Sequence, residues 1–188
     1  MYDLSAAFDT VSHKSLLSKL EIYGFYKMAL KWMKSYLEAR KQTVTVSEEM
    51  STTQDMNIGT PHGSRLSPLF FLCLMADMNL WTEKSTLSNF ADDTQSLVIS
   101  DNLEEAFETT SKEANNVISF FESNNLVNNA DKAAVICNSK GKGKNIIVEN
   151  IGGENLSSVC SEKLFGLYLN SDLNWNTRIE KISIKLKK

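Results

Sequence analysis

The sequence predicts an α+β domain in which an antiparallel sheet has helices packed on one of its faces. The expected elements run in the order strand, helices, loop, buried helix, hairpin, helix and strand. Of the 188 residues, 42% are hydrophobic, which is enough to bury the core of one ordinary globular domain. With 8 Gly and 2 Pro, no low-complexity segment and no visible internal repeat, the composition argues against general disorder.

The first half of the chain predicts mainly helices. Residues 2–8 are expected to form a strand that runs into a turn or short helix, and two helices separated by Gly24 follow. In the second helix, apolar residues at three- and four-residue spacing predict a single apolar stripe, formed by Met28, Trp32, Met33, Tyr36 and Leu37. Residues 43–46 alternate as in a strand, and residues 58–64 form a loop rich in Gly and Pro.

The second half adds a buried helix and a hairpin. Ser67 and Pro68 open a helix that is apolar almost all round from residue 69 to 80, which predicts burial. Residues 89–95 suggest a hairpin with two aspartates at its bend, and Asp101 is expected to cap a long helix after it. Strands are expected at residues 133–137, 145–148 and 164–169, and a basic amphipathic segment from Trp175. A basic break at residues 140–144 is the predicted boundary between residues 1–139 and 140–188.

The cysteines and apolar runs argue against secretion and against a membrane partner. The three cysteines are odd in number and far apart, which argues against a disulfide framework and favours a reducing compartment. No signal peptide is recognisable, so we expect an intracellular protein of the nucleus or cytoplasm. The longest apolar run, residues 69–76, is too short to span a bilayer.

Charge is distributed unevenly although the net charge is only −3. Residues 1–135 carry 11 Lys and Arg against 18 Asp and Glu, whereas residues 136–188 carry 9 against 5. A basic end after an acidic body suits a polyanion that lies across one end of the molecule, and a solvated surface is the simpler alternative.

Three carboxylates are the first candidates for chemistry. Asp3 ends the predicted first strand, and Asp92 and Asp93 lie at the hairpin bend. Adjacent carboxylates on an apolar hairpin repel each other, and a divalent cation such as Mg²⁺ removes that cost. If the first strand lies beside the hairpin, the three could hold two metal ions for an in-line phosphoryl displacement. An isolated Asp-Asp pair is more often only a surface turn.

Five ordered motifs place these carboxylates in a family context. Residues 3–13 (DLSAAFDTVSH), 59–68 (GTPHGSRLSP), 90–93 (FADD) and 129–132 (NADK) resemble four palm motifs of non-LTR reverse transcriptases, closest to the jockey-like type. Residues 164–169 with 173–175 are similar to the primer-contacting segment that follows them. The resemblance therefore implies a polymerase palm over residues 1–139, and a primer-grip-like segment with the beginning of a thumb over residues 140–188.

The resemblance also implies roles for individual residues. The metal ligands of two Mg²⁺ ions, with Mn²⁺ as the alternative, would be Asp3, the Leu4 carbonyl, Asp92 and Asp93. Lys132 would approach the triphosphate as charge partner or proton donor. Phe8 would select deoxynucleotides, with Ala7, His62 and Gly63 around the nucleotide. Leu164, Phe165 and Gly166 would contact the primer. The nucleic-acid-binding residues of the basic end would be Lys140, Lys142, Lys144, Arg178, Lys181 and Lys185. Simpler alternatives are a core position for Phe8 and a solvated Lys132.

The implied activity is RNA-directed DNA synthesis, with an RNA template, a DNA primer and deoxynucleoside triphosphates as partners. The family pattern includes a fingers subdomain upstream of Asp3, so this sequence resembles an N-terminally truncated domain. We therefore expect weak or no activity unless another segment or chain supplies the fingers. A silent retrotransposon-derived remnant and a stand-alone RNA-binding module are the alternatives.

Overall fold

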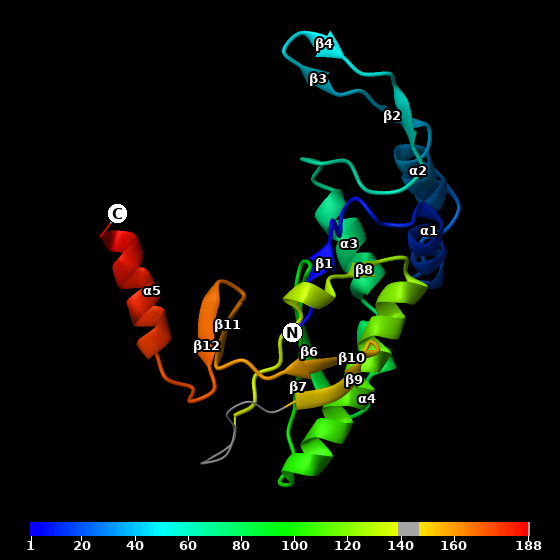
Figure 1. The fold of residues 1–188 in the computed structure, drawn as a ribbon. Coiled ribbons are helices and arrows are strands. Elements are labelled where there is room, and N and C mark those ends of the chain that lie inside the picture. The colour runs from blue at the N-terminus through cyan, green and yellow to red at the C-terminus, as the bar shows by residue number, and fades with distance from the viewer. Residues whose placement is uncertain (139–146, 188) are drawn as a thin grey trace. The chain divides into compact units, whose positions relative to one another are not determined.

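The computed structural model describes residues 1–138 and 147–187, and these residues divide between two compact units. Unit 1 comprises residues 1–4, 79–119 and the described part of 128–188; unit 2 comprises residues 5–78 and 120–127. The chain passes from one unit to the other after residues 4, 78, 119 and 127, and the first and last of these points lie within two short strands, β1 (Leu4–Ser5) and β8 (Val127–Asn128). Figure 1 shows the elements in chain order.

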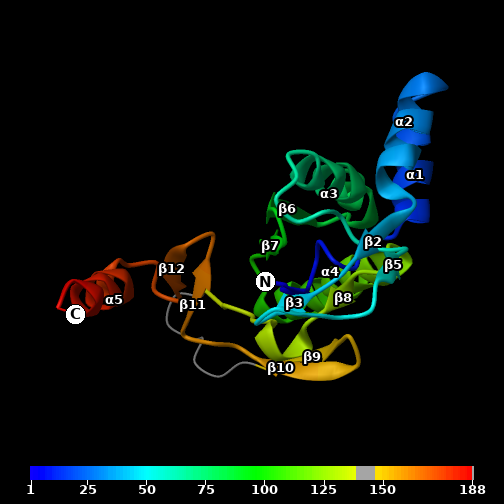
Figure 2. The same ribbon diagram turned by 90° about the horizontal axis from the view of Figure 1, so that it is seen from above.

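Unit 2 begins with the two predicted helices, α1 (His13–Ile22) and α2 (Met28–Leu37), which lie side by side in Figures 1 and 2. Ser12 is the N-cap of α1, because its hydroxyl accepts a hydrogen bond from the Ser15 N–H at 3.3 Å. Gly24 lies between the helices with φ +94°, a conformation that glycine adopts without strain. The predicted break at this glycine is confirmed.

The core of unit 2 lies between α1 and α3 (Ser67–Met75), the helix that Ser67 and Pro68 open as predicted. Phe70, Phe71 and Leu74 are at most 1% exposed and pack with Leu16 and Leu20 of α1. The prediction of a helix buried all round was wrong, because α3 ends at Met75 and its other face is open. Leu69 and Leu72 are about half exposed on that face.

The predicted apolar stripe of α2 was also wrong. Only Leu37 is buried in α2, while Met28 is 76% and Trp32 54% exposed. At 100° per residue, the side that faces the unit carries Leu30, Met33 and Leu37, and Met28 and Trp32 project away from it. Periodicity alone could not distinguish these two overlapping stripes.

Two antiparallel strand pairs follow α2. β2 (Arg40–Gln42) pairs with β5 (Gln54–Met56), and β3 (Thr45–Val46) pairs with β4 (Glu49–Met50). The predicted strand at residues 43–46 is therefore confirmed only for its second half. The β3–β4 turn holds Ser47 and Glu48 at positive φ, as a type I′ turn requires.

Unit 1 contains the predicted acidic hairpin, formed by β6 (Ser85–Phe90) and β7 (Asp93–Val98) after a 3-10 helix, η1 (Met78–Trp81). The long helix α4 (Leu103–Ser123) follows. Its cap is Asn102, whose side-chain oxygen accepts from the Glu104 N–H at 3.0 Å. The prediction of Asp101 as the cap was therefore wrong by one residue.

Glu113 of α4 holds the start of β6 in place. Its side chain is completely buried, and its carboxylate accepts hydrogen bonds from the N–H groups of Glu83 and Lys84 and from the Ser85 hydroxyl. Donors of this kind compensate the loss of hydration of a buried carboxylate. This anchor could not be predicted from the sequence, because its partners lie about 30 residues away.

The C-terminal part of unit 1 is built from hairpins. β9 (Ile147–Ile151) pairs with β10 (Glu154–Ser157), and β11 (Ser161–Leu164) pairs with β12 (Leu167–Asn170). The single strand predicted at residues 164–169 was wrong, because Phe165 and Gly166 form the turn of this second hairpin. Residues 133–137 form only one bridge, Val135 to Ser158, after the 3-10 helix η2 (Ala130–Lys132). The predicted amphipathic end is α5 (Asn176–Leu186).

The mixed α+β class is confirmed, but in the described residues the strands pair in twos rather than in one continuous sheet. None of the described helices combines the length and apolarity needed to cross a bilayer. The predicted boundary at residues 140–144 falls outside the described residues, and the described residues on either side of it, from 128 to 138 and from 147 onward, belong to unit 1.

Candidate active site

The N-terminal segment lies beside the acidic hairpin. Tyr2 forms an antiparallel bridge with Thr94, in which the Tyr2 N–H donates to the Thr94 carbonyl at 2.8 Å. In an antiparallel pair, the residue after Tyr2 lies opposite the residue before Thr94, so Asp3 and Asp93 are neighbours across the two segments. The first strand thus lies beside the hairpin, which is the arrangement needed to bring Asp3 and Asp93 together.

Asp92 lies in the two-residue turn of the hairpin, between the closing pair Phe90 and Asp93. The other turn residue, Ala91, has φ +53°, where its Cβ costs about 1–2 kcal/mol. Strain of this kind persists where the surrounding structure holds it, and it is frequent at functional sites.

Asp3 and Asp93 both line a cavity of about 390 Å³ in unit 1. Its lining also includes two further carboxylates, Asp131 and Glu162, and two lysines, Lys132 and Lys163. Four acidic and two basic side chains leave the lining with a formal charge of −2. Asp92 is not part of this lining.

Lys132, which lines this cavity, forms an ion pair with Asp3. Its Nζ lies 3.0 Å from Oδ2 of Asp3, and the Asn129 N–H donates to the Asp3 backbone carbonyl at 2.9 Å. These contacts join the predicted fourth motif to the first over 129 residues of sequence. Because the Lys132 side chain is 64% exposed, the ion pair contributes little to stability.

The residues of this cavity suit a divalent cation. Mg²⁺ in phosphoryl-transfer sites uses one or two carboxylates and completes its shell with phosphate oxygens and water. Asp3 and Asp93 provide such a donor set, because they are opposed to each other, have one lysine as a partner and belong to a lining of charge −2. In the described part of the chain, no group of three or more His, Cys, Asp or Glu is arranged to hold a metal ion.

The predicted primer-contacting residues lie next to the acidic hairpin. Phe165 and Gly166 have φ +48° and +79°, the values of a type I′ turn. The ring centroid of Phe165 lies 6.3 Å from that of Phe90, the residue before the strained turn. Leu164 is buried and lines the same cavity as Asp3 and Asp93. The structure thus brings the tips of these two hairpins together.

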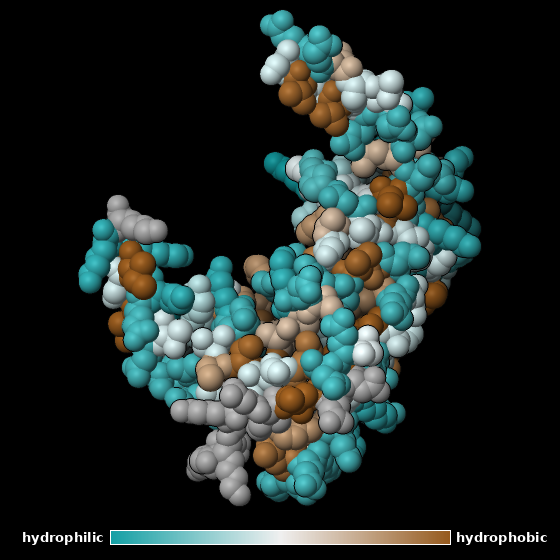
Figure 3. Space-filling model, viewed as in Figure 1, coloured by the Kyte–Doolittle hydropathy of each residue, from teal (hydrophilic) through white to brown (hydrophobic). Residues whose placement is uncertain are grey.

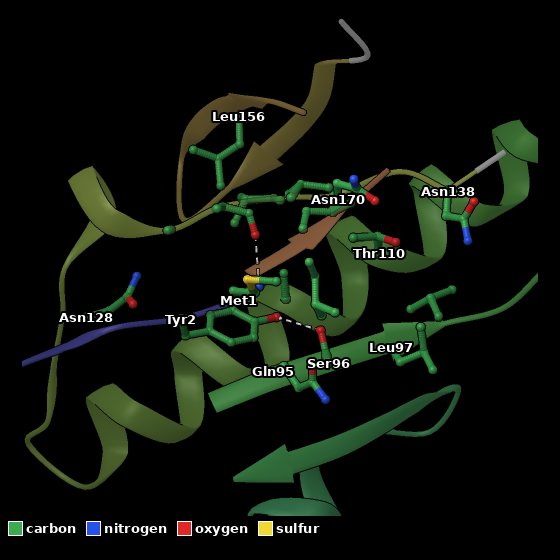
Figure 4. A pocket seen from close by; sticks show the side chains of 18 of the residues that line it. Met1, Tyr2, Gln95, Ser96, Leu97, Thr110, Asn128, Asn138, Leu156 and Asn170 are labelled. Atoms are coloured by element: carbon green, nitrogen blue, oxygen red, sulfur yellow. Dashed lines mark hydrogen bonds between the residues drawn. The ribbon is translucent and has the colours of Figure 1, made fainter. Parts of the chain in front are cut away.

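A second cavity of about 440 Å³ in unit 1 shares Tyr2 with the first (Figure 4). The Tyr2 hydroxyl forms a 3.1 Å hydrogen bond with the Ser96 hydroxyl. Burial raises the pKa of Tyr2 to about 12, and the negative charge of Glu113 acts in the same direction while the Ser96 hydrogen bond opposes it. Tyr2 therefore stays neutral at physiological pH beside a negatively charged cavity.

In unit 2, the predicted nucleotide-binding residues Phe8, His62 and Gly63 line one cavity of about 310 Å³. The Phe8 ring is half-buried, with its centroid 4.9 Å from that of Phe71, so it is both a core residue and a wall of this cavity. Gly63 has φ +74° and no atom within 4 Å of the place where a Cβ would lie. Its loop is open to a ligand on that side.

Gly59 and His13 fix the position of this loop. A Cβ on Gly59 would lie 2.8 Å from the Asp9 carbonyl oxygen, so only glycine fits there. The His13 ring nitrogen is 2.6 Å from the Gly59 carbonyl oxygen, and the ring of His62 contacts the Asp9 carboxylate at 2.5 Å. The sequence motif includes Gly59, but nothing local in the sequence indicates this close approach, because Asp9 lies 50 residues earlier.

The remaining predicted site residues give less evidence of a binding site. Leu4 and Ala7 are both 4% exposed, and Ala7 is not part of the lining around Phe8. Arg178 lies over the Trp175 ring at 5.5 Å and Lys181 over the Tyr168 ring at 5.7 Å, while Lys185 is exposed in the last turn of α5. The helix α5 also carries exposed hydrophobic side chains (Figure 3). Lys140, Lys142 and Lys144 lie outside the described residues.

Comparison with known proteins finds sequences similar to this chain. The family model described as reverse transcriptase (RNA-dependent DNA polymerase) matches residues 1–169. A Drosophila melanogaster protein named "Probable RNA-directed DNA polymerase from transposon BS" is 35% identical over 104 residues, covering 48% of this chain and 11% of that protein. The corresponding polymerase from transposon X-element of the same fly is 35% identical over 103 residues, covering 48% and 10%. The matched part thus spans about a tenth of each relative.

The family match includes Asp3, the acidic hairpin, Lys132 and the second hairpin through Leu169, and therefore all the elements that surround the carboxylate cavity. The resemblance predicted from the sequence motifs is confirmed. The chain belongs to the reverse transcriptase (RNA-dependent DNA polymerase) family.

Proposed function

We propose that this domain acts as the palm of an RNA-directed DNA polymerase, which adds deoxynucleotides to the 3′ end of a primer by two-metal nucleotidyl transfer. One observation carries the proposal: Asp3 and Asp93 face one cavity together with Lys132 and with Leu164 of the predicted primer-contacting hairpin. Carboxylates, a lysine and a primer-side turn around one space are the components that such a transfer needs.

Asp3 and Asp93 would hold the metal, with Asp92 and the Leu4 carbonyl as the further ligands that the family resemblance implies. When bound, Mg²⁺ stabilises negative charge on the attacking and leaving oxygens. The protein's own contribution is to keep two carboxylates opposed on hydrogen-bonded segments, so that no reorganisation is needed when the substrates arrive.

Lys132 would change partners during the reaction. In the structure its ammonium group neutralises Asp3 at 3.0 Å. A divalent cation between the carboxylates would replace that charge, which frees Lys132 to bind the triphosphate or to protonate the leaving pyrophosphate. Its exposed stem leaves it free to reorient.

The family resemblance also implies which substrates would bind. Phe8, with Ala7 beside it in sequence, would exclude a ribose 2′-hydroxyl and so select deoxynucleotides, while His62 and Gly63 would contact the nucleotide. The turn of Phe165 and Gly166 would support a DNA primer paired to an RNA template. Substituting Phe8 by valine should then increase incorporation of ribonucleotides relative to deoxynucleotides.

The test is extension of a DNA primer annealed to an RNA template by the purified chain with Mg²⁺ or Mn²⁺. The proposal predicts template-directed addition, however slow, that Asp93→Asn abolishes. Asp101→Asn, an exposed carboxylate of the same unit, serves as the matched control and should leave addition unchanged.

The second candidate is a remnant that folds or binds nucleic acid without turnover. It is favoured by the position of Asp92, which does not line the cavity with Asp3 and Asp93. Nucleic-acid binding without any extension, at every concentration of either metal, would support this candidate and refute the polymerase proposal for this chain.

A further inference from the structure

The segment around α2 is basic within an acidic part of the chain. Residues 27–41 contain one acidic residue, Glu38, and five basic ones: Lys27, Lys31, Lys34, Arg40 and Lys41. The rest of residues 1–135 contains 6 Lys and Arg against 17 Asp and Glu. A concentration of positive charge in one short segment of an otherwise acidic region suits a polyanion.

Aromatic rings stack along the same helix. Trp32 and Tyr36 are one turn apart, with ring centroids 5.8 Å apart and planes inclined by only 21°. The Arg40 guanidinium lies 4.4 Å from the Tyr36 ring centroid and is fixed there by a 2.7 Å hydrogen bond from its Nε to the Tyr36 carbonyl. Trp32, Tyr36 and Arg40 thus form one continuous stack, which we call the α2 stack.

The outer end of the α2 stack is open and its inner end is anchored. Trp32 is 54% exposed, and Met28 beside it is 76% exposed. At the inner end, the Tyr36 hydroxyl contacts the Ser64 hydroxyl at 2.5 Å, and the Tyr36 ring lies 6.0 Å from that of Phe70 in the core. Ser64 lines the cavity with Phe8 and Gly63, so the stack is joined directly to the predicted nucleotide loop.

The lysines of this segment differ in their ion pairing. In the part of the chain that the structure describes, Lys27 and Lys31 make no ion pair, whereas Lys34 pairs with Glu38 at 3.6 Å and Lys41 with Asp55 at 3.6 Å. Lys31 precedes Trp32 on the exposed side of α2, and Lys27 lies one turn earlier. Ammonium groups without an ion pair, on the same segment as an exposed indole, can combine phosphate binding with a stacking face.

We infer that the α2 stack binds single-stranded nucleic acid, with a base stacked on Trp32 and the neighbouring phosphates on Lys27 and Lys31. The inference rests on the proposed function, in which the unpaired part of the template strand is the occupant. A protein partner would suit the apolar ring and Met28 but would leave the unpaired lysines unexplained. Within a duplex the base faces are stacked on one another and are exposed only at the two ends, so a duplex binds less well at this surface.

The test is binding of a fluorescent single-stranded RNA, the same sequence as DNA, and a blunt RNA–DNA duplex, each measured by anisotropy at several salt concentrations. Trp32→Leu keeps apolar bulk but loses the stacking face, and it should weaken binding of the single strands about 5- to 100-fold. Trp32→Phe should retain most of the affinity, and duplex binding should change little in either variant. The RNA and DNA arms show which strand is preferred.

Lys27→Gln with Lys31→Gln should reduce the slope of log affinity against log salt by about 1.4, because each single-strand phosphate contact contributes about 0.7. Lys14→Gln, an exposed lysine on α1 of the same unit, is the control and should leave the slope unchanged. Wild-type binding that Trp32→Leu does not weaken would overturn the inference and leave the proposed function intact. A chain that binds none of the three nucleic acids would refute both.

Discussion

Replacing Glu113 should destabilise the protein more than replacing any exposed carboxylate on the same helix. The Glu113 side chain is fully buried and accepts from the N–H groups of Glu83 and Lys84 and from the Ser85 hydroxyl at 2.9–3.2 Å. Each hydrogen bond to a charged group is worth about 1.5–3 kcal/mol, and removal also leaves buried donors without a partner. These costs are not additive, so we expect about 3–5 kcal/mol for Glu113→Ala.

The measurement is urea unfolding followed by far-UV circular dichroism. Because a loss of 3–5 kcal/mol approaches the whole stability of many domains, Glu113→Gln is needed as a milder variant. Its amide oxygen can keep some of the donors while the charge is lost, so we expect about 1–2 kcal/mol. Glu108→Gln, an exposed site on α4, should change stability by less than about 0.5 kcal/mol. If Glu113→Ala costs less than about 1 kcal/mol, the carboxylate does not hold the start of β6.

Three further predictions concern the loop, Tyr2 and α5. Gly59→Ala should cost about 2–4 kcal/mol, because its Cβ would meet the Asp9 carbonyl at 2.8 Å, whereas Gly63→Ala, with positive φ but open space, should cost only about 1–2 kcal/mol in the same unfolding assay. The pKa of Tyr2 is raised from 10.0 to about 12 in the folded protein, so the unfolded chain loses this proton first as the pH rises. The free energy of unfolding should therefore fall by roughly 2–3 kcal/mol between pH 10 and pH 12. Tyr2→Phe should remove that fall, and a variant with the same pH profile as the wild type would contradict the assignment. Substituting Arg178, Lys181 and Lys185 by Gln should flatten the salt dependence of primer–template binding by about 2–3 in slope, whereas an identical slope would mean that α5 is only a solvated helix.

Features encoded by neighbouring residues could be predicted from the sequence. The start of α3 follows from Ser67 and Pro68, and the acidic hairpin follows from two short alternating segments around Asp92 and Asp93. The order of the motifs then placed Asp3 beside the hairpin, since the resemblance implied one site. Such features can be predicted because they depend on neighbouring residues or on the family motifs, and not on which distant side chains pack together.

Features that depend on distant partners could not be predicted. Glu113 resembles any other helix glutamate until its three donors near residue 84 are known. The exposed position of Trp32 depends on which of two overlapping stripes faces the core, and Phe165 carries no signal for the positive φ that it adopts in its turn. The Asp101 prediction failed because Asn102, an equally good cap, lies one residue closer to α4.

Whether Asp3 and Asp93 share a cation is tested most directly by titrating the purified chain with Mn²⁺ and measuring free and bound metal by electron paramagnetic resonance. If both carboxylates hold one ion, Asp3→Asn and Asp93→Asn should each weaken Mn²⁺ binding about tenfold or more, and the double variant should be little weaker than either alone. Asp101→Asn should bind as the wild type does. Unchanged binding in either single variant, or losses that simply add in the double variant, would contradict a shared metal site at this cavity.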